Sequence, residues 1–171
     1  MTTELAPVIL TAKMERRAQG HFDRLRAAHF PPERNYLAAH ITMFHHLPET
    51  REVELRRDLK DEARHERHIP VRVDRLRNLG KGVAYVLESP ELLDFRDRLA
   101  RRWEHDLVPQ DAGRWQPHVT VQNKVSPEDA RMLMAELEAG FSPWTFTVTG
   151  ASLWFYRGGP WDKICDTAFR P

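Results

Sequence analysis

The sequence predicts an α+β fold, and three observations support this prediction. Short apolar runs typical of strands alternate with longer amphipathic segments of helical spacing along the 171 residues. Two Ser-Pro-Glu stretches, residues 89–91 and 126–128, have the chemistry of a helix N-cap with proline in the first turn. The segment His40-Ile41-Thr42-Met43 recurs nearly half a chain later as His118-Val119-Thr120-Val121. This repeat predicts two related lobes.

The first half of the chain is expected to form a strand, a helix, a strand, a helix and a strand, in that order. Ala18, Phe22 and Leu25 have the spacing of one helix face, and the pair Pro31-Pro32 ends that helix because proline cannot continue it. The later Arg/Glu-rich stretch has the charge pairing of a solvated helix face rather than an RNA-binding patch. The expected elements are residues 7–12, 15–29, 36–47, 50–65 and 71–76.

The second half is expected to continue with strands and capped helices. Residues 78–82, Asn-Leu-Gly-Lys-Gly, predict a turn that joins two strands in a hairpin. Residues 111–114, Asp-Ala-Gly-Arg, predict a second turn. The expected strands are residues 83–88, 115–125, 145–156 and 163–169, and the expected helices are residues 90–103 and 126–140.

Composition restricts the class of protein. The length predicts one domain, residues 1–171, and 41% hydrophobic residues argue against general disorder. Lys and Arg number 26 against 25 Asp and Glu, so an anionic ligand has to be held by a local cluster. The single cysteine excludes an internal disulfide framework and a cysteine-rich zinc site. Neither a signal peptide nor an apolar run of about 20 residues is recognisable, so we expect a cytoplasmic monomer.

The repeated His-x-Thr segment carries the chemistry. Side chains two residues apart in a strand share a face, so His40 projects with Thr42, and His118 with Thr120. If the lobes face each other, two imidazoles and two hydroxyls converge. Imidazoles can accept and deliver protons near neutral pH, and hydroxyls can donate to phosphate oxygens. These groups suit the opening of a cyclic phosphodiester, or its reverse, without a metal ion.

These residues resemble the two-histidine (2H) phosphoesterase superfamily, in its bacterial 2′-5′ RNA ligase and cyclic phosphodiesterase branch. The family pattern of His, apolar, Ser or Thr, apolar is matched at residues 40–43 and 118–121, and Pro117 also resembles the second motif. The resemblance implies a bilobal fold with a pseudo-twofold axis, in which each lobe has an antiparallel sheet flanked by helices and a cleft lies between the lobes.

The same resemblance implies an activity without a cofactor. It implies metal-independent opening of 2′,3′-cyclic phosphates to 2′-phosphates, or reversible 2′-5′ joining of RNA ends. His40 and His118 would be the acid and the base, and Thr42 and Thr120 would hold the phosphate. The implied partners are RNA ends or small cyclic-phosphate nucleotides. The residues leave the direction, the physiological substrate and the assignment of acid and base open.

Further substrate contacts are expected near these motifs and in the aromatic stretch before the C-terminal strand. Strand phase places Phe44 after Thr42, where it could stack on a base, and Gln122 after Thr120, where it could bind phosphate or sugar. A place in the core is an equal alternative for Phe44. The candidates in the aromatic stretch are Trp154, Tyr156 and Arg157.

The neighbouring histidines are expected to have other roles. His45 is out of phase with His40 and is expected to be a strand-end residue or, if the strand continues, to pack on the core side, whereas His46 could touch the far end of a substrate. Zinc binding by His40, His45 and His46 is disfavoured because a strand divides them between two faces.

Two other function classes remain open at this point. One is a non-catalytic module that binds RNA ends, although binding alone would not need two proton-transfer groups. The other is a phosphodiesterase of a cyclic nucleotide-like metabolite that is not RNA. An enzyme of RNA should gain affinity with added nucleotides and lose it with added salt.

Overall fold

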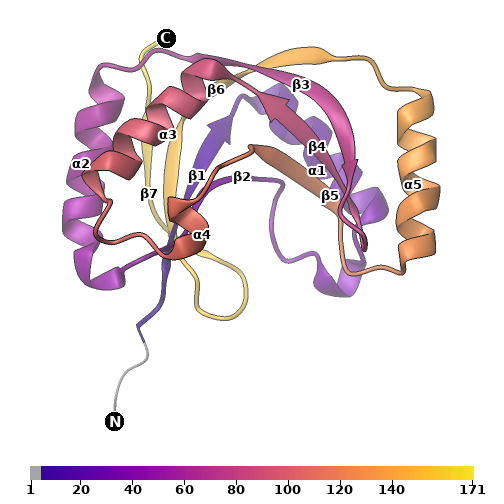
Figure 1. The fold of residues 1–171 in the computed structure, drawn as a ribbon, viewed down its shortest axis with the longest axis horizontal. Helices are drawn as coiled ribbons and strands as arrows, with labels where there is room; N and C mark the ends of the chain where they lie inside the picture. The colour runs from indigo at the N-terminus through magenta and orange to yellow at the C-terminus, as the bar shows by residue number, and fades with distance from the viewer. Residues whose placement is uncertain (1–4) are drawn as a thin grey trace.

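Seven antiparallel strands form one sheet in the computed structural model, which describes residues 5–171. The strand order is β2-β1-β6-β3-β4-β5, and β7 pairs with β6 (Figure 1). The strands are β1 Val8–Met14, β2 Ile41–Leu47, β3 Ile69–Asn78, β4 Val83–Glu88, β5 His118–Gln122, β6 Trp144–Phe155 and β7 Asp162–Ala168. The helices are α1 Arg16–His29, α2 Glu52–Arg64, α3 Pro90–Arg102, α4 Pro109–Ala112 and α5 Pro127–Ala139, with 3-10 turns η1 Pro32–Arg34 and η2 Glu49–Arg51.

The two halves of the chain repeat one arrangement. The order β1-α1-β2-α2-β3 of the first half matches β4-α3-β5-α5-β6 of the second once the short α4 is set aside. Exchanging the two halves simply reverses the strand order of the sheet, so the topology has a pseudo-twofold axis between β3 and β6. The two His-x-Thr segments therefore occupy equivalent positions, at β2 and β5, the two ends of this strand order.

Strand β6 joins the two halves into one sheet. Its first residues pair with β3, from Trp144↔Val73 to Val148↔Ile69. Its later residues pair with β1 on one side and β7 on the other. The two sheets expected from the sequence are thus continuous, because a single long strand belongs to both.

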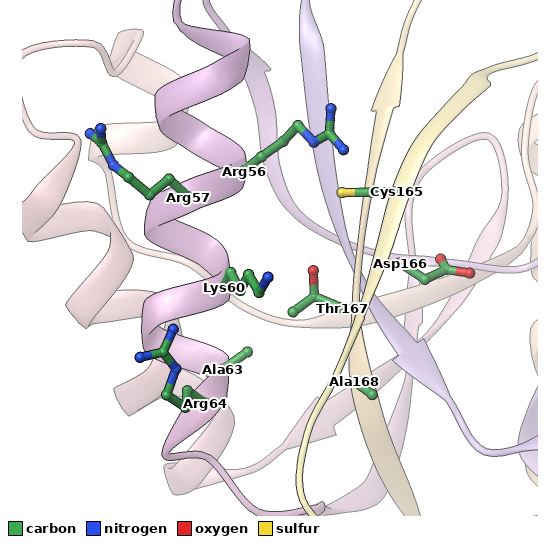
Figure 2. Close-up of a pocket in the computed structure, with 9 residues that line it drawn as sticks. All are labelled: Arg56, Arg57, Lys60, Ala63, Arg64, Cys165, Asp166, Thr167 and Ala168. Atoms are coloured by element: carbon green, nitrogen blue, oxygen red, sulfur yellow. The ribbon is translucent and has the colours of Figure 1, made fainter.

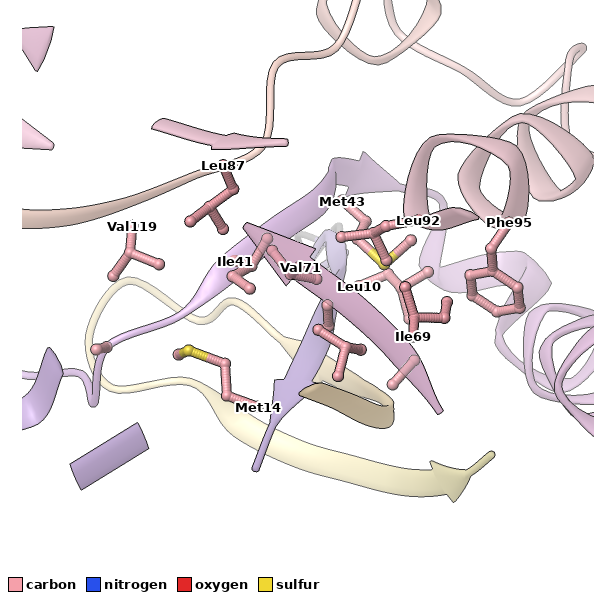
Figure 3. Close-up of a cluster of buried hydrophobic side chains, with 14 of the residues drawn as sticks. Leu10, Met14, Ile41, Met43, Ile69, Val71, Leu87, Leu92, Phe95 and Val119 are labelled. Atoms are coloured by element: carbon pink, nitrogen blue, oxygen red, sulfur yellow. The ribbon is translucent and has the colours of Figure 1, made fainter. Parts of the chain in front are cut away.

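Apolar side chains between the sheet and the helices make up the core. Helices α2 and α3 lie together near one end of the sheet, and α5 lies near the opposite end (Figure 1). Leu10, Ile41, Val71, Leu87 and Val119 come from five different strands and are fully buried (Figure 3). Each buried side chain of this size contributes about 1.5–3 kcal/mol to folding. The core therefore anchors β2 and β5, the strands that carry the repeated segment.

The predicted elements are confirmed, with shifted boundaries in the strands that matter most. Ser89 and Ser126 cap α3 and α5 as expected, their hydroxyls accepting from the N–H groups of Leu92 and Asp129. The expected strand at residues 36–47 starts only at Ile41, so His40 directly precedes β2. The turn expected at residues 111–114 is largely wrong, because α4 already covers Pro109–Ala112. Between residues 5 and 171, no helix is both long enough and apolar enough to span a bilayer.

Candidate active site

His40 and His118 are each held by a hydrogen bond of the same kind, from the ring to a backbone carbonyl two residues earlier. The Nδ1 atom of His40 lies 2.9 Å from the carbonyl oxygen of Ala38, and that of His118 lies 3.0 Å from the carbonyl oxygen of Gln116. A carbonyl only accepts, so Nδ1 carries the proton and donates in both rings. In the neutral form of either ring Nε2 is therefore an acceptor, and in the protonated form Nε2 is a donor. Two imidazoles in equivalent positions thus have the same tautomer and the same orientation relative to their strands.

Two long-range hydrogen bonds connect the strands that carry the repeat to the opposite half of the chain. The indole Nε1 of Trp115, just before β5, donates to the carbonyl oxygen of Thr42 at 2.9 Å. The guanidinium of Arg26, on α1, donates to the carbonyl oxygen of Thr120 at 3.0 Å. Strands β2 and β5 are in contact. The two His-x-Thr segments thus converge although they are far apart in sequence.

The side chains of both segments alternate as expected. Ile41 and Met43 are fully buried, as are Val119 and Val121, whereas the His and Thr residues between them are partly exposed. The predicted division into a core face and a chemistry-bearing face is therefore confirmed for the residues from His40 to Met43 and from His118 to Val121.

Burial gives His40 an unusually low pKa. Loss of water contact is the main cause, and the nearby charges of Arg26, His118 and His45 lower the pKa further. The carbonyl of Ala38 acts in the opposite direction, but the pKa still falls to about 4. His40 is therefore neutral near pH 7. The influence of His118 on this pKa also places the two imidazoles within electrostatic reach of each other.

A cleft of about 410 Å³ opens beside His40 and Thr120. Its cationic lining residues are Arg26, Arg34 and Lys124, and its aromatic ones include Tyr36, Tyr156 and Trp161. The Trp161 ring lies 4.8 Å from the His40 ring. We refer to this space as the cleft. Its cations provide the local cluster that an anionic ligand would require in a chain of nearly balanced charge.

An adjoining aromatic pocket of about 360 Å³ also includes His40 in its lining. Trp154 and Trp161 form part of its wall, with ring centroids 6.1 Å apart. The Trp154 indole is fixed by a 2.9 Å hydrogen bond to the Thr11 hydroxyl, and Lys163 lies over the Trp154 ring. A planar, polar-edged group could stack here beside the imidazole.

The comparison with protein families agrees with this geometry. The family model of the 2′-5′ RNA ligase superfamily matches residues 14–160, a range that includes both His-x-Thr segments. The chain belongs to this superfamily. Membership supports phosphoesterase or ligase chemistry. The region where the two His-x-Thr segments meet is therefore the candidate active site.

Solved structures with the same fold include E. coli LigT and a protein of Thermus thermophilus. E. coli LigT complexed with 3′-AMP is 18% identical, with a TM-score of 0.67 over 98% of this chain and 100% of that chain. The protein TT0787 of Thermus thermophilus is 14% identical, with a TM-score of 0.69 over 96% of this chain and 98% of that chain. At these identities the likeness concerns the fold. Among proteins of curated function, none matches the sequence significantly.

Three of the five further contacts predicted for this superfamily member lie near the cleft. Trp154 lines the aromatic pocket. Tyr156 lines the cleft itself and is 44% exposed. Arg157 lies outside the cleft, in a neighbouring hollow, and its side chain pairs with Asp162 at 3.0 Å.

Of the two alternatives for Phe44 the structure shows the place in the core, and Gln122 does not line the cleft. Phe44 is fully buried, and its ring packs edge-on against Trp103 at 5.3 Å. Gln122 is only 6% exposed and lines a separate hollow beside α5. The cause at Phe44 is a bulge, because β1 pairs Leu10 with Phe44 but the next residue, Thr11, with Thr42. The extra residue turns Phe44 to the core.

The same bulge reverses the expected direction of His45, because the residue after the buried Phe44 turns to the opposite face. The His45 side chain is 38% exposed instead of packing inside. A second bulge follows, since between the pairs Leu10↔Phe44 and Val8↔Leu47 β2 contains one residue more than β1, and His46 is exposed as well. The ring Nδ1 of His45 lies 3.0 Å from Oδ1 of Asp111, whose side chain is completely buried.

Several residues of the candidate site were missed by sequence reasoning. Arg26 is one of several arginines in an amphipathic helix, and Trp161 follows a Gly-Gly-Pro turn, so neither has a recognisable pattern. Asn123 carries a weak signal because it follows β5 directly. Lys124 is recognisable in the sequence as a cation at a strand end, where a place on the plain surface is the favoured interpretation. Lys124 has a φ of 61°, a backbone conformation that non-glycine residues seldom adopt and that is enriched at functional sites.

Another hollow, of about 630 Å³, lies between α2 and β7 and contains neither catalytic candidate. Figure 2 shows Arg56 and Lys60 directed from α2 toward β7, with Cys165 and Thr167 facing them. Arg56 is paired with Glu52 on the same helix at 3.3 Å. Among residues 5–171, no cluster of three or more His, Cys, Asp or Glu side chains is arranged to hold a metal ion.

Proposed function

We propose that this protein opens 2′,3′-cyclic phosphates of RNA ends or nucleotides to 2′-phosphates, and that the same step with a 5′-hydroxyl in place of water joins RNA ends through a 2′-5′ linkage. The observation that carries the proposal is the matched pair of imidazoles, each oriented by a backbone carbonyl two residues earlier. Superfamily membership and the nucleotide complexes of LigT support it.

In this mechanism His40 is the general base and His118 the general acid. His40 is neutral near pH 7 because its pKa is about 4, so its free Nε2 can take a proton from the attacking oxygen. The new P–O bond forms as the P–O3′ bond breaks, and His118 gives a proton to O3′. The phosphate remains on O2′. In the reverse reaction the two histidines exchange roles.

The hydroxyls of Thr42 and Thr120 would donate to the two non-bridging oxygens, where negative charge develops during attack. Arg26 and Lys124 line the cleft and add positive potential there. The protein thereby supplies both proton transfers and the charge stabilisation. The mechanism therefore requires no metal ion.

A nucleoside attached to the phosphate would occupy the aromatic pocket. Trp161 lies against His40, so a group stacked on Trp161 is adjacent to the reacting phosphate. Stacking of a base on an aromatic side chain contributes about 1–3 kcal/mol and tolerates any base. The pocket thus favours nucleotides over simple phosphate esters.

The decisive experiment is turnover of a 2′,3′-cyclic nucleotide in the presence of EDTA, with identification of the product isomer. The 2′-phosphate is expected, and chelation should have no effect. His40→Ala and His118→Ala should each reduce kcat/KM at least about 100-fold, because each removes a proton-transfer group.

His105→Ala is the matched control, since the His105 side chain is 94% exposed and lines neither the cleft nor the aromatic pocket. It should retain full activity. Unchanged turnover in either active-site variant, loss of activity with EDTA, or a 3′-phosphate product would contradict the mechanism. A cleft that binds nucleotides but turns over none of them would favour a binding module instead.

A further inference from the structure

The hollow that contains His45 has no role in the mechanism above. We call it the β2 hollow; it has a volume of about 630 Å³. Its polar lining side chains are His45, His46, Gln110, Tyr156 and Arg157. All of these can donate hydrogen bonds, and no carboxylate among residues 5–171 is part of the lining. A lining of donors without acidic groups suits an anion.

The β2 hollow adjoins the cleft. Tyr156 and Gly158 line both spaces, so a ligand that leaves the cleft past Tyr156 enters the hollow. His45 follows Thr42 by three residues on β2, a separation of about 10 Å at roughly 3.3 Å per residue. An anion bound at His45 is therefore close to the reacting phosphate but distinct from it.

Asp111 fixes His45 in place. The two Asp111 oxygens accept the backbone N–H groups of His45, at 2.9 and 3.0 Å, and of His46, at 2.9 Å, in addition to the His45 ring. Burial acts to raise the pKa of Asp111, but these hydrogen bonds outweigh it and keep that pKa below its ordinary value. The carboxylate is thus ionised and accepts from Nδ1, which leaves Nε2 of His45 to interact with a ligand.

A structural role alone does not explain why the His45 ring binds Asp111. The backbone N–H groups of His45 and His46 would satisfy Asp111 without any imidazole. The ring nevertheless projects into the hollow with 38% of the side chain exposed. Arg157 is the cationic donor there, and its exposed pair with Asp162 is weak enough, at about 1 kcal/mol or less, to be exchanged for a ligand.

We propose that the β2 hollow binds the phosphodiester group that precedes the terminal nucleotide of an RNA 3′ end, and that His45 is its oriented contact. Between ionised Asp111 and this phosphate, the imidazolium form of His45 donates from both ring nitrogens. Arg157 provides a second charged contact. The inference rests on the proposed function, because it extends the nucleotide of the cleft by one unit, and it makes an RNA end the preferred substrate over a mononucleotide.

The test compares the binding of two non-reactive products by calorimetry, adenosine 2′-phosphate and the dinucleotide adenylyl-adenosine 2′-phosphate. The wild type should bind the dinucleotide at least about 10-fold more tightly, the gain expected of charge-assisted hydrogen bonds. His45→Ala and Arg157→Ala should each remove most of this preference while changing mononucleotide binding by a much smaller factor. His105→Ala is the control and should keep the preference.

A second ligand separates charge from stacking. A dinucleotide with a neutral methylphosphonate linkage keeps both bases but loses the internal anion. It should lose the preference in the wild type and bind wild type and His45→Ala alike. Thermal unfolding of His45→Ala, in which Asp111 retains both backbone donors, checks that the fold is intact.

Equal binding of the two products by the wild type would overturn the inference, as would a His45→Ala variant that keeps the preference. An equal loss of affinity for both ligands in His45→Ala would also contradict the inference, because His45 would then act in the cleft or in the fold. Turnover is measured separately, so a protein that opens cyclic mononucleotides but shows no dinucleotide preference refutes the second phosphate site alone. Absence of binding for both products would refute this site and the proposed function together.

Discussion

His40 and His118 occupy equivalent places in the fold, but their surroundings differ. The cationic neighbours of His40 include Arg26, whose guanidinium is itself buried and reaches the backbone of Thr120. The partial loss of water contact and this charge both disfavour a second proton on His40. These surroundings lower the proton affinity of His40, which suits the residue proposed as the base.

The pH dependence of kcat/KM should reveal this difference. The proposed base must be neutral, so activity falls as the pH drops through the pKa of His40, about 4, and is retained between that value and the usual histidine range near 6.5. In Arg26→Met, removal of a positive neighbour should move this acid limb to higher pH. An acid limb near 6.5 in the wild type that is unaffected by Arg26→Met would contradict the assignment.

Trp161 should contribute mainly to binding. Its ring contacts His40 at 4.8 Å and forms a wall of the aromatic pocket. Trp161→Ala should raise KM for a cyclic nucleotide about 10-fold, since one base–aromatic stack contributes about 1–3 kcal/mol. Trp161→Phe should restore most of the loss. A large fall in kcat with unchanged KM would instead indicate that Trp161 acts on the orientation of His40.

Strand β2, at one end of the sheet, is secured by side chains from the second half of the chain. Trp115 donates to the carbonyl of Thr42, Arg96 donates to the carbonyl of Met43 at 2.9 Å, and Asp111 accepts from the backbone after Phe44. An exposed strand edge would leave these groups free to pair with other chains. Here they are used to hold two bulges, which set the positions of the side chains that follow.

Arg96 on α3 and Arg26 on α1 are counterparts in the two halves, since each is buried and donates to a carbonyl of the other half's His-x-Thr strand. Arg96 also donates to the carbonyl of Asp111 at 2.7 Å. Arg96→Met should lower the free energy of unfolding by about 2–4 kcal/mol, because two carbonyls lose a charged donor.

The measurement is urea denaturation, with the exposed Arg101→Met of the same helix as the control. The control should change stability by less than about 0.5 kcal/mol. Equal stability of the two variants would show that the buried arginine does not support β2.

At the scale of the molecule, the two halves repeat the same order of elements but share one sheet. The residues of β6 pair with β3, β1 and β7, so every strand is connected through it. Val148 lies at the centre of this strand, fully buried and paired with both Met14 and Ile69. Neither half can complete its hydrogen bonds or its core without β6.

We therefore expect residues 1–171 to unfold as one domain. Far-ultraviolet circular dichroism and tryptophan fluorescence should report coincident transitions in denaturant, as for other single domains of this size. Two separated transitions, or a stable fragment that lacks β6, would refute this expectation.

Local sequence patterns were sufficient to predict most helices and strands and the two His-x-Thr motifs. Apolar periodicity and the Ser-Pro-Glu caps predicted the helices from Ser89 and Ser126, because capping and amphipathicity act within one turn of chain. The repeat of His-x-Thr also predicted two equivalent strands and the faces of His40 and His118, since alternation in a strand is a local property.

By itself the sequence therefore determined the fold class and the pair His40 and His118, and only the tertiary structure decided the positions of the residues that follow the first motif, up to Leu47. Phe44 went to the core and His45 to the side of the cleft because bulges depend on pairing with β1 and on Arg96 and Asp111, residues more than 50 positions away. The periodicity of one strand does not show a β-bulge, because a residue is extra only in relation to the strand with which it pairs. The same reason hid Arg26 and Trp161, whose roles arise from long-range contacts with Thr120 and His40.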